Sequence, residues 1–145
     1  MRPGLIEGIR KLVRRATPNT EAPAGGEVQF EYTPCLDGDP DPGEVVWTWV
    51  PYEEDPSQGK DRPVVIIGRR NGTLMAVPLT SKSHANQSQV AIGIGPWDQA
   101  GRPSYAKVER LLQIDPLLVR REGAVLQRQH FDDVVAGVRR AHRPR

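Results

Sequence analysis

The sequence has a single cysteine, Cys35, among its 145 residues. One thiol can form neither an internal disulfide nor a cysteine-based zinc site, and such scarcity is typical of a reducing compartment. No apolar run approaches the roughly 18 residues that mark a transmembrane helix, and no N-terminal apolar stretch precedes a cleavage site of small residues. We therefore expect a cytoplasmic protein with no membrane span and no signal peptide.

The common nucleotide-binding, metal-binding and hydrolase motifs are also missing. The sequence has no Gly-rich phosphate loop, no His-Glu-x-x-His pattern, no paired cysteines and no Gly-x-Ser-x-Gly elbow. Its three histidines, His84, His130 and His142, are far apart and lack the spacing of metal ligands. We therefore expect no metal and no cofactor.

The remaining composition is that of one globular domain. The chain is 37% hydrophobic and 26% charged, close to the average of soluble proteins. At 145 residues it is long enough to bury one core without disulfides or metals. The 14 prolines and 14 glycines favour many short elements over a few long helices.

Acidic and basic residues are unevenly distributed along the chain. Residues 1–20 carry a net charge of +4, residues 21–56 carry −10 with no Lys or Arg, and residues 57–145 carry +8, which together give the net +2 of the chain. A basic second half can attract a polyphosphate chain through release of counterions. Charges dispersed over a solvated exterior explain the same numbers, so both interpretations stay open.

The first 42 residues are predicted to be an extension of a folded domain that spans 43–145. Within the extension we expect, in order, a basic amphipathic helix over 5–16, a flexible linker over 17–26 (TPNTEAPAGG), a short strand around Phe30 and an acidic, turn-rich stretch over 34–43. We interpret this extension as an appendage to the binding or catalytic core.

The domain itself is predicted to be mainly β with a helix at its end. Strands are expected over 44–50, 63–68, 73–80 and 89–94, with a strand-like region around 105–111 and a long polar loop over 51–61. Five closely spaced strands indicate a small, strongly bent antiparallel sheet or partial barrel. Asp115 and Pro116 are typical of a helix cap, and apolar spacing predicts a C-terminal helix over 127–142.

Three local signals sharpen the prediction for the central strands. The β-branched run over 63–68 indicates a strand covered on both faces. Asn71-Gly72 is typical of a tight hairpin turn, because both residues tolerate a positive φ. Pro78 cannot donate to a strand ladder, so it predicts a bulge or an edge near the end of its strand.

From residue 43 the sequence resembles the PemK/MazF family, the toxins of bacterial type II toxin–antitoxin modules. Four motifs carry the resemblance, in family order and spacing: Gly43-Glu44-Val45-Val46-Trp47, Gln58-Gly59-x-x-Arg62-Pro63, Val64-Val65-Ile66-Ile67 and Val77-Pro78-Leu79-Thr80-Ser81. The resemblance covers about residues 43–142, which is most of the chain.

The resemblance implies a fold and a function. The fold is an SH3-like small barrel with appended helices, shared with the gyrase-targeting CcdB toxins, and the family is usually homodimeric. The implied activity is a metal-independent endoribonuclease that cuts single-stranded RNA and is inhibited by a cognate antitoxin. The alternative is a non-catalytic nucleic-acid-binding or gyrase-targeting module on the same fold.

The resemblance assigns Arg62 and Thr80 as the active-site residues. Arg62 lies nine residues before Asn71 and Thr80 eight residues after Gly72, so one hairpin turn brings both to its open end. A guanidinium offers a permanent positive charge and a planar fork of donors for phosphate oxygens. The alternatives are an ordinary strand role for Thr80 and a structural ion pair for Arg62, with Asp61, Glu53 or Glu54 as partner.

Further residues are expected along the RNA: Gln58, Gly59, Lys60, Ser81, Lys82, Lys107 and Arg110. Gln58 and Gly59 match the family loop that gates the RNA groove, with a plain surface turn as the alternative. Val108-Glu109-Arg110 stands in the strand where many family members have an Asp-Gln-type pair. His84 is a candidate acid or base, because imidazoles titrate near neutral pH; a solvated loop residue is the alternative.

Trp47 and Trp49 fall on one face of the predicted strand over 44–50. Aromatic rings in this position can stack exposed bases. Core packing or a dimer interface is the interpretation that we favour.

Overall fold

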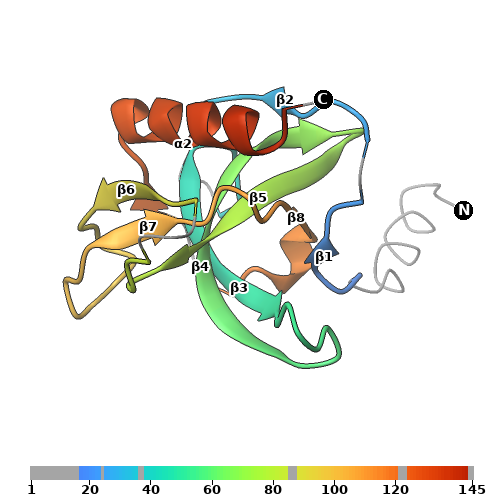
Figure 1. Cartoon of the computed structure of the whole chain (residues 1–145), viewed down its shortest axis with the longest axis horizontal. Helices are drawn as coiled ribbons and strands as arrows, with labels where there is room; N and C mark the ends of the chain where they lie inside the picture. Colours follow the sequence, from blue (N-terminus) through green and yellow to red (C-terminus); the bar gives the residue numbers. More distant parts are fainter. Residues whose placement is uncertain (1–16, 24, 36–37, 85–87, 121–123, 144–145) are drawn as a thin grey trace, which may run out of the picture.

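The computed structural model describes residues 17–23, 25–35, 38–84, 88–120 and 124–143. Within these ranges the chain forms β-strands, a short 3-10 helix η1 (Pro116–Leu118) and one α-helix, α2 (Arg128–Ala141) (Figure 1). The strands are β1 (Thr20–Glu21), β2 (Gln29–Phe30), β3 (Glu44–Pro51), β4 (Gly59–Arg70), β5 (Thr73–Thr80), β6 (Val90–Gly93), β7 (Ser104–Ala106), β8 (Leu112–Ile114) and β9 (Ala124–Val125). The helix expected over 5–16 lies outside the described residues.

The mainly β prediction with a C-terminal helix is confirmed. The strand order is β1-β8-β5-β4-β3-β9, β2 pairs with β4, and β7 joins β5 to β6. All of these pairings are antiparallel. The path ends at β1 and at β9, so the pairings of the described residues do not close the sheet into a barrel.

The core lies on both faces of β4 and β5. On one face Val65, Ile67, Val77 and Leu79 pack with the apolar stripe of α2, which lies across this side of the sheet (Figure 1). The members of that stripe are Phe131, Val134, Val135 and Val138. The other face carries a second cluster, formed by Val46, Val50, Val64, Ile66, Leu74, Ala76, Leu112 and Ile114. The expectation of a strand covered on both faces is therefore confirmed.

The Asn-Gly turn joins β4 to β5 as predicted. Asn71 has φ 52° and Gly72 has φ 81°, the left-handed pair of values that a tight hairpin turn requires. From this turn the register runs to the pair Val64↔Pro78, with a shift between Ile66 and Gly68. Gly68 sits at the irregularity because a Cβ there would lie 2.0 Å from the carbonyl oxygen of Gln29.

Pro78 lies where β5 changes its partner. Ala76 pairs with Leu112 of β8, whereas Leu79 pairs with Ala106 of β7. The register shift on the β4 side occurs at Ile66/Gly68 and not at Pro78. A residue without an N–H fits at such a switch, where the ladder is interrupted in any case.

The loop expected over 51–61 is shorter in the structure. Pro51 of β3 pairs with Gly59 of β4, so the hairpin extends the ladder into the polar sequence. Lys60 and Asp61 are strand residues whose side chains reach solvent. The polar sequence led us to predict a loop here, because the end of the hairpin projects beyond the core and its strand residues are polar.

The N-terminal segment packs on the sheet where its composition predicts a flexible linker. Asn19 is 1% exposed and joins two elements: its Nδ2 donates to Thr48 Oγ1 (2.8 Å) and to the Trp49 carbonyl (2.7 Å), and its Oδ1 accepts from the Asp115 N–H (2.9 Å). Thr20 and Glu21 then pair with β8. Arg70 holds the following stretch by donating to the carbonyls of Pro23 and Gly25.

The helical predictions near the C-terminus are confirmed. Asp115 accepts a hydrogen bond from the Leu117 N–H (2.9 Å) and caps η1, with Pro116 in its first turn. The helix expected over 127–142 is α2. Arg139 lies over the Phe30 ring at 4.9 Å, so this cation contacts an aromatic face in addition to sitting at the helix C-terminus. No helix of the described residues is long and apolar enough to span a membrane.

Candidate active site

A groove of about 400 Å³ opens at the end of the β4–β5 hairpin away from the Asn-Gly turn. It is lined by Trp47, Lys60, Asp61, Arg62, Pro63, Leu79, Thr80, Ser81, Lys82, His84, Asp98, Arg102, Ser104 and Lys107. Seven of the ten predicted site residues are in this lining: Lys60, Arg62, Thr80, Ser81, Lys82, His84 and Lys107. The fold thus brings together residues that are up to 47 positions apart in the sequence.

Arg62 and Thr80 enter the groove from neighbouring antiparallel strands. The β4–β5 register runs to Val64↔Pro78, and each residue lies two positions beyond that pair. Arg62 also pairs with Thr48 of β3, and Thr80 with Tyr105 of β7, so each position is held by a strand on its outer side as well. Both side chains are half-buried.

The ion pair considered for Arg62 is not formed within the described part of the chain. Asp61 pairs instead with Arg120 (2.9 Å). Glu53 pairs with Lys107 (3.3 Å). None of the ion pairs between described residues involves Arg62. Its guanidinium thus lines the groove without forming an ion pair to any described carboxylate.

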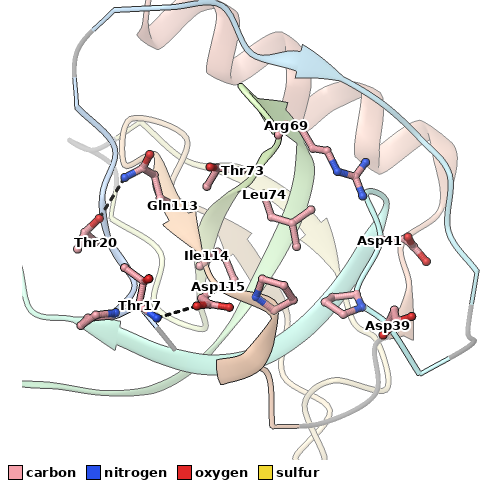
Figure 2. A pocket seen from close by; sticks show the side chains of 14 residues that line it. Thr17, Thr20, Asp39, Asp41, Arg69, Thr73, Leu74, Gln113, Ile114 and Asp115 are labelled. Atoms are coloured by element: carbon pink, nitrogen blue, oxygen red, sulfur yellow. Dashed lines mark hydrogen bonds between the residues drawn. The ribbon is translucent and has the colours of Figure 1, made fainter. Parts of the chain in front are cut away.

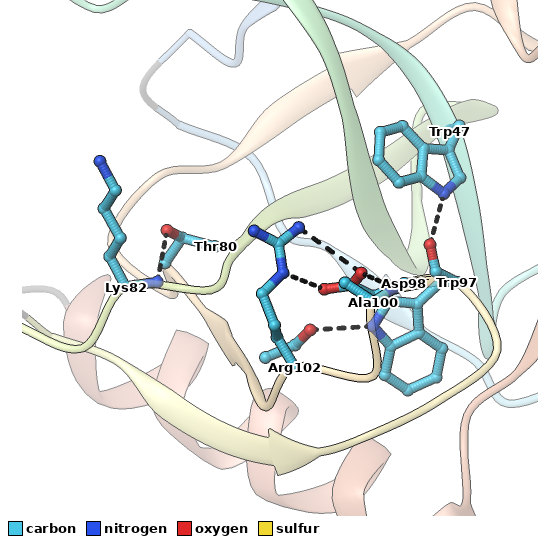
Figure 3. A network of polar contacts seen from close by, with 8 residues as sticks. Trp47, Thr80, Lys82, Trp97, Asp98, Ala100 and Arg102 are labelled. Carbon is cyan, nitrogen blue, oxygen red and sulfur yellow. Dashed lines mark hydrogen bonds and ion pairs between the residues drawn. The ribbon is translucent and has the colours of Figure 1, made fainter.

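The Thr80 hydroxyl has a fixed orientation. Its oxygen accepts a hydrogen bond from the Lys82 backbone N–H at 3.1 Å (Figure 3). A hydroxyl that accepts in this way still has its own O–H to donate. The donor is therefore available to an oxygen bound in the groove.

The groove is cationic. Five of the lining residues are Lys or Arg (Lys60, Arg62, Lys82, Arg102 and Lys107), and two are carboxylates (Asp61 and Asp98), an excess of three positive charges. Like charges gathered in one concave surface raise the local concentration of an anionic chain. This clustering favours the polyphosphate interpretation of the basic second half over evenly dispersed charge.

Hydrogen bonds join His84 and Lys82, which follow β5, to Gln89. The His84 N–H donates to Gln89 Oε1 (3.0 Å), and Gln89 Nε2 donates to the Lys82 carbonyl (3.2 Å). The His84 side chain is exposed at the groove. Among the described residues the imidazole has no hydrogen-bond partner, so only its backbone is fixed by the fold.

Three predicted site residues lie outside the groove lining. Gln58 is an exposed turn residue whose carbonyl accepts from the Tyr52 N–H (2.9 Å). Gly59 lies against β3, because a Cβ there would sit 2.3 Å from the Val50 carbonyl oxygen. Gln58 and Gly59 are two positions and one position before Lys60, which lines the groove.

The third of them is Arg110, whose guanidinium faces the interior, where its donors are used. The residue is 7% exposed, and its Nε donates to Glu21 Oε1 at 2.5 Å. Its Nη2 donates to the Pro51 carbonyl. Arg110 therefore joins β1 to the β3–β4 hairpin, and its side chain is not presented to a phosphate in the groove.

The two tryptophans of β3 differ in their surroundings. Trp47 is half-buried at the groove, and its indole N–H donates to the Trp97 carbonyl (2.9 Å) (Figure 3). Trp49 is also half-buried and packs against Gly59. These contacts give both rings a packing role, the interpretation favoured from the sequence.

Sequence reasoning missed Asp98 and Arg102 in the groove lining. The Arg102 Nε donates to Asp98 Oδ2 at 2.9 Å (Figure 3). This contact holds the pKa of Asp98 below its ordinary value of 3.8, chiefly through the hydrogen bond from Arg102, so the pair is ionised at neutral pH. The only available signal was an Asp and an Arg four residues apart in a turn-rich segment.

A second hollow, of about 660 Å³, has a different chemistry (Figure 2). It lies between the segment from Thr17, the tip of the β4–β5 hairpin and η1. Three carboxylates line it, whereas its single cation, Arg69, pairs with Glu31 at 2.6 Å. It contains none of the predicted site residues and has the wrong charge for an anionic chain. No group of three or more potential metal ligands occurs among the described residues.

The fold and the groove define a small, mainly β protein with one C-terminal helix and a cationic groove at the end of a hairpin. Residues 41–142 match the sequence profile of the PemK-like, MazF-like toxins of type II toxin–antitoxin systems. The chain belongs to this family. A comparison with curated proteins gave no match.

Solved structures that match this chain include MazF toxins. A MazE–MazF complex from Deinococcus radiodurans matches with a TM-score of 0.52 and 19% identity, over 70% of this chain and 94% of that one. An endoribonuclease from a mycobacterial species matches with a TM-score of 0.49 and 15% identity, over 71% and 90% of the two chains. The Mycobacterium tuberculosis toxin MazF-mt6 gives a TM-score of 0.47 and 14% identity, over 66% and 94%.

Proposed function

We propose that this protein is an endoribonuclease toxin that cleaves single-stranded RNA without a metal ion. The observation that carries the proposal is the placement of Arg62 and Thr80 in one cationic groove, on neighbouring strands of one hairpin. Family membership supports it, because the resemblance assigned these two residues to the active site. Five Lys and Arg side chains in the lining suit a phosphate backbone.

The proposed chemistry is attack by a ribose 2′-hydroxyl on the adjacent phosphorus. A bond forms between the 2′-oxygen and phosphorus, and the bond from phosphorus to the 5′-oxygen breaks. The products are a 2′,3′-cyclic phosphate and a 5′-hydroxyl, and one proton moves from the nucleophile to the leaving oxygen. Negative charge builds on the non-bridging oxygens during this step.

Arg62 is proposed to stabilise that developing charge. It has no carboxylate partner among the described residues, so its donors can serve a phosphate. A well-aimed donor contributes about 2.7–4 kcal/mol in comparable oxyanion sites. Arg62 does not act as the base, because a guanidinium stays protonated in proteins.

Thr80 is proposed to hold the scissile phosphate or the 2′-hydroxyl. The Lys82 N–H fixes the hydroxyl oxygen, and the O–H then donates toward the groove. Lys60, Ser81, Lys82 and Lys107 are proposed to contact the flanking nucleotides, with Gln58 and Gly59 in the loop beside them. His84 was the candidate acid or base, but among the described residues no contact aims its ring, so we propose that it is a solvated loop residue.

The partners and the oligomeric state follow the family. We propose a cognate antitoxin, a cytoplasmic location and a homodimer, and we infer that the sheet belongs to an SH3-like barrel. The similar structure from Deinococcus radiodurans is a MazE–MazF complex, which supports the expectation of an antitoxin partner.

The decisive experiment is incubation of the purified protein with a long single-stranded RNA of mixed sequence in EDTA. We expect fragments that begin with a 5′-hydroxyl, which a polynucleotide kinase labels without prior phosphatase treatment. Arg62→Ala should abolish cleavage, whereas Arg69→Ala should not. Arg69 lies on the same strand but outside the groove, which makes it a matched control.

Other outcomes would favour the alternative module. RNA binding with no scission at any metal concentration would indicate a non-catalytic binder. Intact RNA together with gyrase-dependent breaks in plasmid DNA would indicate a gyrase-targeting relative. Cleavage that persists in Arg62→Ala would remove the assigned site.

A further inference from the structure

The loop between β6 and β7 is anchored at the groove by Trp97. This side chain is 6% exposed, and its indole N–H donates to Ser104 Oγ (2.9 Å). Its carbonyl accepts from the indole of Trp47 (2.9 Å). Gly95 permits the close packing, since a Cβ there would lie 2.2 Å from the Trp97 ring. The loop is thus fixed to both β3 and β7.

A tight turn then folds Arg102 back onto Asp98. The Asp98 Oδ1 accepts from the Ala100 N–H (2.9 Å), and the Gly101 N–H donates to the Asp98 carbonyl (3.0 Å). Gly101 has φ 68°, which favours glycine at this position. The Asp98 carboxylate accepts hydrogen bonds from Arg102: Nε donates to Oδ2 at 2.9 Å and Nη2 donates to Oδ1 at 3.5 Å.

Arg102 keeps donors that the fold does not use. A guanidinium has five N–H groups, and Asp98 takes one from Nε and one from Nη2. Within the described residues Nη1 has no partner, which leaves three N–H groups. Figure 3 shows the guanidinium between Asp98 and Thr80, and its side chain is 61% exposed.

We propose that Arg102 binds a phosphate of single-stranded RNA beside the scissile one, and that Asp98 positions it for this contact. The inference rests on the proposed function and adds a residue that lies outside the motifs of the resemblance. A carboxylate on one edge of the guanidinium restricts its rotation, so the other edge presents a preformed fork to the groove. Arg102 and Thr80 line the same groove, so a phosphate adjacent to the scissile one can reach the fork.

The plain alternative is an exposed ion pair without function. The chain contains a matched example: Arg128 Nε contacts Asp132 at 3.1 Å, also four residues apart and with 66% of the Arg128 side chain exposed. Arg128 lies on α2 and is not in the groove lining. Exposed pairs of this kind contribute little to stability. Arg128, whose guanidinium also lies over the Tyr32 ring at 5.0 Å, is therefore a control with the same charge, the same spacing and a similar side-chain exposure.

The test measures binding to a mixed-sequence 2′-O-methyl RNA oligonucleotide, which lacks the attacking hydroxyl and stays intact. The Kd is determined between about 50 and 200 mM salt for the unaltered protein, Arg102→Gln and Arg128→Gln. Each phosphate contact contributes about 0.7 to the slope of log K against log salt for a single strand. We expect Arg102→Gln to weaken the salt dependence, reducing the magnitude of the slope by about 0.7. The Kd should rise about three- to tenfold near 0.1 M salt. Arg128→Gln should change neither.

A second variant tests the positioning role of Asp98. Asp98→Ala removes a negative charge from the groove, so simple attraction predicts tighter binding. If Asp98 positions Arg102, Asp98→Ala should weaken RNA binding when Arg102 is present. In an Arg102→Gln background the same substitution should tighten RNA binding, because only the loss of negative charge remains. Thermal unfolding of each variant confirms that the protein is folded.

The outcomes separate the two proposals. If the unaltered protein binds and cleaves RNA but Arg102→Gln behaves like Arg128→Gln, the Arg102 inference is overturned and the nuclease stands. If Asp98→Ala tightens binding in both backgrounds, the positioning role is overturned. If the unaltered protein neither binds the oligonucleotide nor cleaves RNA, the proposed function itself fails.

Discussion

The Thr80 hydroxyl oxygen accepts a hydrogen bond from the Lys82 N–H at 3.1 Å, and the hydroxyl keeps its own proton to donate. Thr80→Ser should keep this arrangement and most of the activity. Thr80→Val preserves the shape but removes the donor, and loss of one such donor lowers kcat about 10²- to 10³-fold. Single-turnover cleavage of RNA measures both variants. Equal activity of the Val and Ser variants would contradict the proposed role.

His84 should prove dispensable for most of the rate. Its ring is exposed and has no hydrogen-bond partner among the described residues, so nothing in the fold aims it. We expect His84→Ala to lower the cleavage rate less than about tenfold, because loss of a true acid or base costs about 10²- to 10⁴-fold. A pH–rate profile of both proteins is the measurement. Loss of one limb of the profile in His84→Ala would identify the histidine as the acid or base.

Asp98 provides a pH-dependent test of its contact with Arg102. Its pKa is held below 3.8 in the folded protein, so the contact is fully present above that value. The contact is lost as pH falls through the lowered pKa, since protonation removes the charge. An NMR titration of the Asp98 carboxyl should give a midpoint below 3.8, and Arg102→Gln should raise it. An unchanged midpoint in the variant would show that the hydrogen bond from Arg102 does not cause the shift.

Gly59 is expected to affect stability more than RNA binding. A Cβ at this position would lie 2.3 Å from the Val50 carbonyl oxygen and 2.7 Å from the Trp49 ring. Gly59→Ala should therefore lower the free energy of unfolding by about 1–3 kcal/mol. Gln58→Ala, in the adjacent exposed position, should leave it within about 0.5 kcal/mol. Urea unfolding compares the two, and a fully stable Gly59→Ala variant would contradict the geometry.

Asn19 should be a stabilising residue despite its position outside the family match. It makes hydrogen bonds to Thr48, Trp49 and Asp115 while almost fully buried. Asn19→Ala removes these three hydrogen bonds, and each contributes about 0.5–1.5 kcal/mol. We expect a loss of at least about 2 kcal/mol in urea unfolding. Thr20→Ala, at an exposed neighbouring position, is the control and should change stability little.

The sequence predicted the part of the candidate site whose placement depends on one hairpin turn. Arg62 and Thr80 are linked by a single hairpin whose Asn-Gly turn is a strong local signal, so sequence counting placed them correctly at one end. Arg102 was not predictable in this way. Its proposed role depends on a carboxylate contact and on the anchoring of Trp97. Asp–Arg spacing alone also describes surface pairs such as Arg128–Asp132.

The N-terminal segment shows a different limit. The stretch TPNTEAPAGG is polar and rich in turn formers, and local composition predicts a linker. Burial of Asn19 depends on partners 29, 30 and 96 residues away. Arg110 was misjudged for the same reason, since the carboxylate of Glu21 that pairs with it is 89 residues away.

The packing of residues 17–23 on β8 has a practical consequence for production of the protein. Family boundaries suggest starting a shortened version at residue 41. That truncation would remove β1 and expose the unpaired edge of β8. It would also remove Glu21, the carboxylate that pairs with Arg110. A bare strand edge recruits other copies of the chain, so such a product should collect in inclusion bodies, and affinity tags belong ahead of residue 17.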